Sequence, residues 1–527
     1  MAIATIERTR TSRGARWAIA AGALVVLLTI AAVIAVRSLK PWARNRVLEA
    51  LRENYSSGLE VRELDFSLFP AARITGRGLV LRHKGRTDVP PLVAIEKFTA
   101  ETGVRDLFEK PLRIRHVRLE GLRIHVQTGQ NNGSHENDPN VSRTTSRLVI
   151  DEVIADGTRL ETIPQSPNKQ PLIWDIKQLT LHDTGPDRPM SFRATLSNAK
   201  PPGEIHTQGS FGPWQREQPR LTPVSGSYTF RDADLSDFPG LSGILSSDGK
   251  YQGVLQRIEV EGSTDTPKFE LQVSRNPVHL TTKFQAVVDG TDGTTRLHPV
   301  EAHFGHSSLT ARGIVDTTPG VPGNIISLDV NVPRSRLEDV LRLGVKGKAS
   351  LTGVTSFHTK FLLSPGNKDI SERLRLDGVF DVADARFSSP DSQDKLEKLS
   401  LRARGRKSDD GDEPVASNFK GHFQLRGGVM HFTDLSFRVP GIDIAMNGTY
   451  GLGNEQLDFH GTARTKAKLS QMTTGFKSFL LKAVDPFFAK QGAGAVLPIQ
   501  ITGTRDSPQF SRDRHHKTDS ASSSQPR

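Results

Sequence analysis

Few residues in this chain have the types and spacing that catalysis or metal binding requires. His303 and His306 lie three positions apart on either side of Phe304, in a segment with strand-like alternation. Residues three apart in a strand point to opposite faces, so the two histidines are not expected to share a metal ion. This pair therefore predicts surface side chains and no metal centre.

Two further groups of potential metal ligands lie in polar segments. His135, Glu136 and Asp138 belong to a stretch rich in Asn, Gly and Ser, and His515 and His516 belong to the polar C-terminal end. Segments of this composition have too few apolar side chains to hold them in a folded site, so solvated side chains are expected at both places. The sequence predicts no metal and no cofactor.

Nucleophilic and nucleotide-dependent chemistry also lacks a basis in the sequence. The chain contains no Cys, which excludes disulfides, thiolate catalysis and cysteine-based metal sites. It carries no GxxxxGK[ST] phosphate loop, no HExxH pair and no G-x-S-x-G nucleophile turn, and its Asp and Glu residues are dispersed. We therefore predict that the protein is not an enzyme.

The charge balance is basic but spread along the chain. There are 70 Lys and Arg residues against 58 Asp and Glu residues, for a formal net charge of +12. No block combines basic and aromatic residues in the manner of nucleic-acid-binding modules. Solubility or the attraction of lipid headgroups accounts for the charge, and no nucleic-acid partner is predicted.

A strongly apolar segment lies near the N-terminus. Trp17 to Val36 is a run of 20 residues in which Thr29 is the single polar side chain, which matches a hydrocarbon core of about 30 Å. Arg8, Arg10, Arg13 and Arg16 precede it, so residues 1–16 are expected in the cytoplasm and the rest outside. The alternative is a cleaved signal peptide, but the run exceeds a signal core and no A-x-A site follows. We predict one transmembrane anchor over residues 17–36.

Beyond Glu60 the hydrophobic pattern changes to a period of two, which indicates strands with one apolar and one wet face. Short spacings filled by Gly, Pro, Asp and Asn separate these runs and favour antiparallel meanders. The chain is thus predicted to be mainly β, as an elongated, curved antiparallel sheet with a few amphipathic helices. The residues predicted to line its apolar face are Leu79, Leu81, Leu122, Ile124, Val126, Phe269, Leu271, Val273, Phe284, Phe380, Val382, Phe423, Leu425, Ile442 and Ile444.

Helical periodicity is confined to a few segments. Short helices are predicted over 44–54, Pro333 to Leu343 and Pro390 to Leu399, and a longer amphipathic helix over 466–488. The long helix either packs its apolar side on the sheet or lies in a membrane interface. That apolar side is formed by Leu469, Met472, Phe476, Phe479, Leu480 and Phe487. Segments 127–147 and 405–418 are predicted surface insertions, and 511–527 a disordered tail.

The apolar face of the predicted sheet must be covered by something. A second sheet would give sandwiches or a barrel. Lipid is the other solution, since a 16-carbon acyl chain gains on the order of 10 kcal/mol when it leaves water, at about 0.8 kcal/mol per CH₂. Composition leaves both possibilities open.

Three parts of the chain carry a resemblance to a known family. The first comprises Gly58 to His83, GLEVRELDFSLFPAARITGRGLVLRH, and Leu112 to Val126, LRIRHVRLEGLRIHV. The second is the central stretch from Gly253 to Val315. The third comprises Gly441 to Lys466, GIDIAMNGTYGLGNEQLDFHGTARTK, and Ala495 to Phe510. Together with the anchor, these stretches resemble the AsmA family, which is related to TamB and to chorein-type bridge proteins.

The resemblance implies a repeating β-groove fold that holds lipid acyl chains and has no catalytic residues. It implies an inner-membrane protein whose bulk faces the periplasm and which supports phospholipid transfer and outer-membrane biogenesis. Phospholipids are the implied cargo, with a further envelope protein as a possible partner. The alternative function is an envelope assembly factor or scaffold acting on outer-membrane protein insertion. The implied divisions are an AsmA-like groove over 37–350 and an AsmA-like C-terminal region over 351–510.

Overall fold

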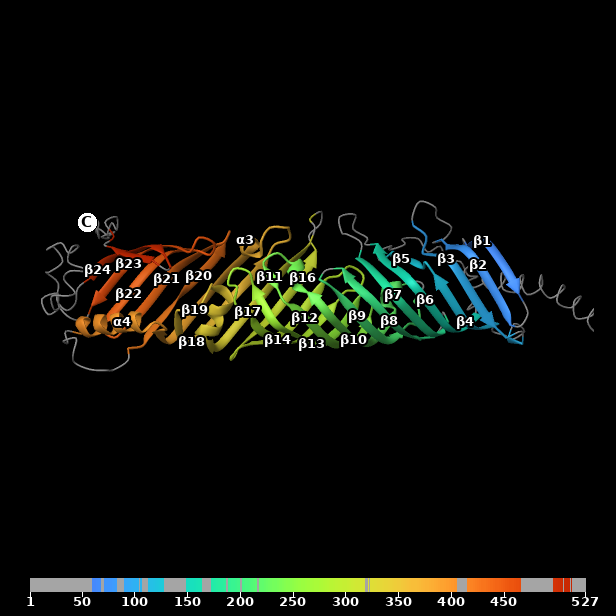
Figure 1. Cartoon of the computed structure of the whole chain (residues 1–527), viewed down its shortest axis with the longest axis horizontal. Helices are drawn as coiled ribbons and strands as arrows, with labels where there is room; N and C mark the ends of the chain where they lie inside the picture. Colours follow the sequence, from blue (N-terminus) through green and yellow to red (C-terminus); the bar gives the residue numbers. More distant parts are fainter. Residues whose placement is uncertain are drawn as a thin grey trace, which may run out of the picture.

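The computed structural model places one long β-sheet, with a few short helices, along most of the chain (Figure 1). The structure describes residues 59–67, 71–82, 90–103, 105–106, 112–127, 148–163, 172–185, 188–199, 201–215, 218–317, 321, 323–404, 415–465, 496–505, 507–511 and 513. The statements below concern these residues.

The sheet contains 25 strands. Its first eleven strands are β1 Leu59–Ser67, β2 Ala72–Leu81, β3 Val93–Thr102, β4 Leu112–Glu120, β5 Arg123–Gln127, β6 Leu148–Ile163, β7 Leu172–Thr184, β8 Met190–Ala199, β9 Pro202–Phe211, β10 Pro223–Asp234 and β11 Leu241–Ser242. The next seven are β12 Ile244–Val254, β13 Arg257–Leu271, β14 Val278–Val288, β15 Thr295–Phe304, β16 Ser307–Thr317, β17 Asn324–Arg336 and β18 Leu351–Leu363. The last seven are β19 Leu374–Phe387, β20 Ser417–Arg426, β21 Val429–Val439, β22 Ile442–Gly451, β23 Gln456–Thr465, β24 Val496–Thr504 and β25 Ser507–Ser511.

Strands that follow one another along the chain pair with one another along most of the sheet. Figure 1 shows the N-terminal strands at one end of the long axis and the C-terminal strands at the other. The extensive contacts between described strands all join hydrogen-bonded neighbours. The described strands thus form one layer, and the sandwich or barrel that the sequence left open is not what they form.

The prediction of a purely antiparallel sheet is wrong at one place, because the sheet is mixed. β4 and β5 both pair with β6 in parallel, as in the partners Ile114 and Ile150. Parallel neighbours need a long connection to bring the chain back to the starting edge. In the sequence, 20 residues at positions 128–147 separate β5 from β6, and they lie outside the described residues.

The two faces of the sheet differ in chemistry, and we name them by their residues. The apolar face is the one that carries Phe423, its partner Phe432 and the further cross-strand neighbours of these residues. The polar face is the opposite one, represented by Lys420, Arg438 and Asp443. The period-two alternation predicted from the sequence is confirmed.

Six strands that run in the same direction each contain one extra residue relative to their neighbours. These β-bulges place two consecutive side chains on the polar face, and a bulge bends its strand. Proline is tolerated in strands at such interruptions because no ladder hydrogen bond is lost, which explains Pro267, Pro299 and Pro333. The six pairs are Arg231–Asp232, Pro267–Lys268, His298–Pro299, Pro333–Arg334, Ala383–Asp384 and Thr433–Asp434.

Short helices connect some of the strands. They are α2 Leu337–Gly344, α3 Ile370–Arg373 and α4 Pro390–Ala403, with the 3₁₀ turns η3 Pro219–Leu221 and η4 Leu235–Asp237. The helix predicted from Pro390 is confirmed and is longer than expected. The helix predicted from Pro333 begins only at Leu337, because Pro333 belongs to the bulge of β17 and not to a helix N-terminus. The insertion predicted up to 418 ends earlier, since β20 begins at Ser417.

Several predictions lie outside the described residues. They concern the N-terminal segment 1–16, the transmembrane anchor 17–36, the helix over 44–54, the amphipathic helix over 466–488 and, apart from Ser511 and Asp513, the tail 511–527. Among the described residues, no helix has the length and apolar character needed to span a membrane. The division between 37–350 and 351–510 stays a prediction; β17 and β18 pair across that point, for example Ile326 with Leu363.

A hydrophobic cluster of nine buried residues lies at the N-terminal end of the sheet. It joins side chains from β1, β2, β3, β4 and β6 on the apolar face. Leu112 is 1% exposed and Ile74 3% exposed within it. Gly76 allows the ring of Phe98 to lie directly on the neighbouring strand, since a Cβ at this position would collide with that ring. This end of the sheet has a core of its own.

Candidate functional site

The feature that best qualifies as a functional surface is the apolar face beyond the N-terminal cluster. Register aligns its side chains in rows that cross many strands, such as Phe437 with Ile444 and then Ala463. Branched and aromatic side chains fill these positions because successive residues of a strand alternate between faces. The result is a band of apolar side chains that continues from strand to strand.

Many large side chains of this face are only half-buried, in contrast to a globular core. Phe380, Phe432, Ile444 and Leu376 all retain part of their surface in contact with solvent. In a sheet packed against a second layer such positions would be fully covered. The exposed apolar area is therefore available to an apolar ligand.

Phenylalanine dominates this face in the C-terminal part of the sheet. The ring of Phe380 lies 6.1 Å from the rings of Phe419, Phe423 and Phe432, measured between centroids. Phe432 continues the series to Phe459 at 5.7 Å. Tilted and edge-to-face contacts at these spacings are favourable aromatic arrangements. They give a connected aromatic surface over β19 to β23.

Two helices cover part of this surface at its margin. Leu337 of α2 packs on Val382 and Ala385 of β19, which are 2% and 1% exposed. Leu396 of α4 packs with Val439 at the end of β21. The helices therefore bury one edge of the apolar face in this region and leave its middle to the phenylalanine rings.

The structure places most of the predicted lining residues on this face. Those in strands with half-buried side chains are Leu79, Leu81, Ile124, Phe269, Leu271, Phe284, Phe380 and Ile444, and those that are buried are Val382, Phe423, Leu425 and Ile442. Leu122 is also buried, at the break between β4 and β5. Val126 belongs to β5. They do not form one pocket but are spread along the length of the sheet.

Two predicted lining residues fall outside the strands, Leu122 at the break between β4 and β5 and Val273 after β13. Val273 follows β13, which ends at Leu271, and lies in a turn. The backbone N–H groups of Ser274 and Arg275 both donate to the carbonyl of Leu271 and reverse the chain there. The prediction extended the strand past its end at Leu271, because a turn can contain an apolar residue that continues the alternating pattern.

The polar face carries charged cross-strand pairs. Lys97 binds Glu120 at 2.6 Å, and His422 binds Asp377 at 2.7 Å. The hydrogen bond from His358 is the main cause that holds the pKa of Asp329 below its ordinary value. Exposed pairs of this kind contribute little to stability. Their distribution identifies this face as the one in contact with water.

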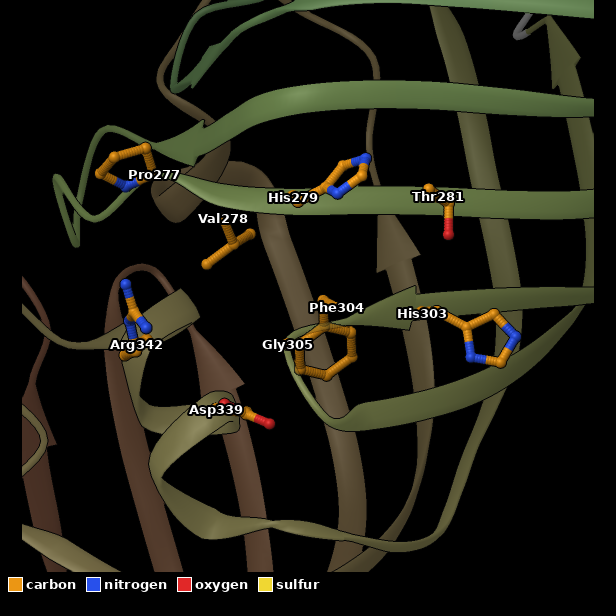
Figure 2. Close-up of a pocket in the computed structure, with 9 residues that line it drawn as sticks. All are labelled: Pro277, Val278, His279, Thr281, His303, Phe304, Gly305, Asp339 and Arg342. Atoms are coloured by element: carbon orange, nitrogen blue, oxygen red, sulfur yellow. The ribbon is translucent and has the colours of Figure 1, made fainter.

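A small pocket lies where the start of β14, the turn between β15 and β16, and α2 meet (Figure 2). Its volume is about 290 Å³. Asp339, 8% exposed, accepts hydrogen bonds from the backbone N–H of His306 and the hydroxyl of Ser307, at 2.8 and 3.0 Å. His279 is held by Asp265 at 2.6 Å. Asp339 attaches α2 to the sheet, His279 and Asp265 join two strands, and these groups are not arranged as a nucleophile and base.

The histidines considered as metal ligands do not meet in the structure. His303 projects from β15 on the polar face, whereas His306 lies in the turn that follows Gly305. No group of three or more potential ligands is found within the described ranges. The candidates His135, Glu136, Asp138, His515 and His516 lie outside those ranges.

Sequence reasoning missed two tyrosines in the middle of the apolar face. Tyr228 and Tyr251 lie on β10 and β12, where their rings cover glycines of the adjacent strand. A signal was present, because each tyrosine follows a glycine at a spacing of two, as Gly226-Ser-Tyr228 and Gly249-Lys-Tyr251. A period-two repeat of this kind places both residues on one face of a strand.

Comparisons of the chain with protein-family models, with curated proteins and with solved structures each gave no match.

Proposed function

We propose that this protein belongs to the AsmA family, binds lipid acyl chains on the apolar face of its sheet, and supports phospholipid transfer to the outer membrane. The observation that carries the proposal is the long apolar face, whose large side chains stay partly exposed along a single-layer sheet. An exposed apolar surface of this extent is typical of a binding surface.

The apolar face of the sheet and an acyl chain are complementary in chemistry. Partly exposed Phe and Ile side chains gain free energy when they leave water, at roughly 25 cal/mol per Å² of apolar area. An acyl chain is flexible, uniformly apolar and without hydrogen-bonding groups. It can follow the row from Phe380 to Phe432 and Phe459 without leaving a polar group unsatisfied. The wet polar face keeps such a complex soluble.

The membrane setting is part of the same proposal. Residues 17–36 would anchor the chain in the inner membrane with residues 1–16 in the cytoplasm, and the sheet would extend into the periplasm. The amphipathic helix over 466–488 would then either pack on the apolar face or lie in a membrane interface. The second arrangement would bring lipid next to the sheet.

Native mass spectrometry of the full-length protein, purified in a mild detergent, tests the proposal. We expect the protein to carry phospholipid that remains bound after detergent exchange. Extraction and analysis of the bound lipid would identify its headgroup and chain length. A protein that is folded and free of lipid under these conditions would rule the proposal out.

A second candidate function is an envelope assembly factor that pairs with strands of outer-membrane proteins. One observation favours it. β25 pairs with residues Gln500 to Thr504 of β24, and no described strand pairs with residues 496–499 on that side. An open edge can accept an added strand. Crosslinking of this edge to barrel proteins, together with a lack of bound lipid, would favour this function over lipid transfer.

A further inference from the structure

The apolar face is interrupted near the middle of the sheet. On β9, β10, β12 and β13 most mid-strand positions of this face carry glycines, hydroxyl residues and tyrosines, and the apolar exceptions include Ile205, Phe230 and Val260. We call this region the waist and define it by Thr207, Gly226, Tyr228, Ser247, Gly249 and Tyr251. Apolar side chains resume on both sides, with Phe192 on β8 and Phe284 on β14.

The two tyrosine rings lie flat across neighbouring strands in opposite directions. Tyr251 reaches from β12 over Gly226 of β10, and a Cβ on that glycine would lie 2.6 Å from the phenol oxygen. Tyr228 reaches from β10 over Gly249 of β12, where a Cβ would lie 2.6 Å from the ring. Glycine is therefore required beneath each ring, and the rings are fixed in place.

The hydroxyl protons of the waist are all used within it. Thr207 donates to the carbonyl of Ser227 at 2.9 Å, so the phenol of Tyr251 donates to Thr207 at 2.7 Å. Ser247 donates to the carbonyl of Ser263 at 2.9 Å, so the phenol of Tyr228 donates to Ser247 at 3.2 Å. Each phenol oxygen then has only acceptor capacity left.

Two consequences follow for any ligand. A phosphate group offers acceptors and would find no donor among these hydroxyls, so the waist does not fit a lipid phosphate. An acyl chain would strip water from the phenol oxygens without replacing its hydrogen bonds, which is unfavourable. Next to the waist, Thr264 and Thr282 bond to each other at 2.7 Å on β13 and β14, so an acyl chain there would also cover hydroxyl groups.

We propose that the waist divides the apolar face into two separate acyl-chain-binding segments, one on its N-terminal side up to β8 and one on its C-terminal side from β14 onward. This inference rests on the proposed function in lipid binding. Bound chains occupy the two segments and cross the waist rarely, so the waist limits movement of lipid along the sheet.

The experiment places benzoylphenylalanine, a photo-crosslinking residue, at three positions of the full-length protein. Phe192 and Phe432 report on the two segments, and Phe230 of β10 reports on the waist strand. The purified protein is illuminated with vesicles of phosphatidylethanolamine and phosphatidylglycerol that carry a radiolabelled acyl chain. We expect labelling at Phe230 to be roughly tenfold lower than at the other two positions, which corresponds to about 1.4 kcal/mol.

A variant then removes the polarity of the waist but keeps its shape, with Tyr228→Phe, Tyr251→Phe, Thr264→Val and Thr282→Val. We expect labelling at Phe230 to rise to within roughly twofold of the flanking positions, because the cost of covering the hydroxyls is gone. The matched control combines Thr281→Val and Thr310→Val, both on the polar face. The control should keep the wild-type pattern.

The outcomes separate the two proposals. Equal labelling at all three positions of the wild-type protein would overturn the waist as a divider and leave lipid binding intact. An unchanged pattern in a folded fourfold variant would assign the tyrosines a purely structural role and would also overturn it. Labelling at none of the positions would overturn lipid binding, and the waist proposal with it. The comparison of labelling at the three positions in the otherwise wild-type protein tests the proposal even if the fourfold variant fails to fold.

Discussion

The two ends of the sheet use the same strand pattern for different purposes. At the N-terminal end Leu112, Ile74 and Phe98 are 1%, 3% and 8% exposed and form a packed cluster. In the C-terminal part Phe380 and Phe432 occupy equivalent positions on the apolar face but stay half-buried. Alternation alone therefore does not tell whether a residue stabilises the fold or is available to a ligand.

The difference has a physical origin in how the side chains fill space. In the N-terminal cluster aliphatic side chains from five strands interdigitate, and the ring of Phe98 fills the space above Gly76. In the C-terminal part the rings touch one another at centroid distances near 6 Å, for example 6.2 Å between Phe419 and Phe437. These rings contact one another but remain only partly buried.

The largest expected effect is on the stability of the N-terminal end. Leu112→Ala removes a fully buried side chain, which costs about 3 kcal/mol within a usual range of about 2–5 kcal/mol. Amide hydrogen exchange of β3 and β4 should accelerate roughly a hundredfold. The control is Leu376→Ala on the half-buried C-terminal face, for which a smaller loss is expected. Equal losses of stability in Leu112→Ala and Leu376→Ala would show that the two ends of the sheet do not differ in packing.

The second effect concerns lipid capture. Phe380→Asp places a charge at the centre of the phenylalanine rings, and we expect bound lipid to fall roughly tenfold because a buried carboxylate is costly. Val379→Asp is the matched control on the same strand, since Val379 is 54% exposed on the polar face. Native mass spectrometry measures both. A similar loss in the two variants would mean that the apolar face has no special part in lipid binding.

A smaller effect is expected at a polar anchor of the N-terminal end. Asp106 accepts from Arg115 at 2.6 Å and from the N–H of Gly103 at 3.0 Å, and the bond from Arg115 holds the pKa of Asp106 below its ordinary value. Asp106→Asn should cost about 1 kcal/mol, a value reduced because Arg115 is exposed.

The pH dependence of this cost has a defined sign. A carboxyl whose pKa is lowered by folding adds stability above its unfolded pKa, and the contribution disappears as the pH falls through the folded pKa. Urea unfolding of both proteins should therefore differ most near neutral pH and converge in acid. A difference that grows in acid would contradict the assigned role of Asp106.

The smallest effect is expected at the C-terminal end. The hydrogen bond to Asp513, supported by Asp458, raises the pKa of His460 above its ordinary value. Protonated His460 adds stability below its unfolded pKa of about 6.5, and the contribution is lost as the pH rises through the folded pKa. His460→Gln should cost a few tenths of a kcal/mol near pH 6, after allowance for solvent screening, and nothing at alkaline pH. Thermal unfolding of both proteins, measured from about pH 6 to alkaline pH, tests this difference in stability.

Much of the architecture could be predicted from the order of residues. Alternation identified strands such as those of Phe423 and Ile442, because the period of side-chain direction is a local property of extended backbone. The segment from Pro390 was recognised as a helix for the same local reason. Pro333 was misread because a proline suits both a helix start and a β-bulge, and only pairing with β18 decides between them.

The sequence by itself determined the strands, their apolar and polar sides, and the lack of catalytic motifs, since each of these depends on neighbours along the chain. Tertiary structure decided the parallel pairing of β4 and β5 with β6, the burial of Leu112 against the exposure of Phe380, and the crossing of Tyr228 and Tyr251 over their glycines. Each of these features depends on which strands become neighbours in space, and the sequence of a single strand does not specify its neighbours.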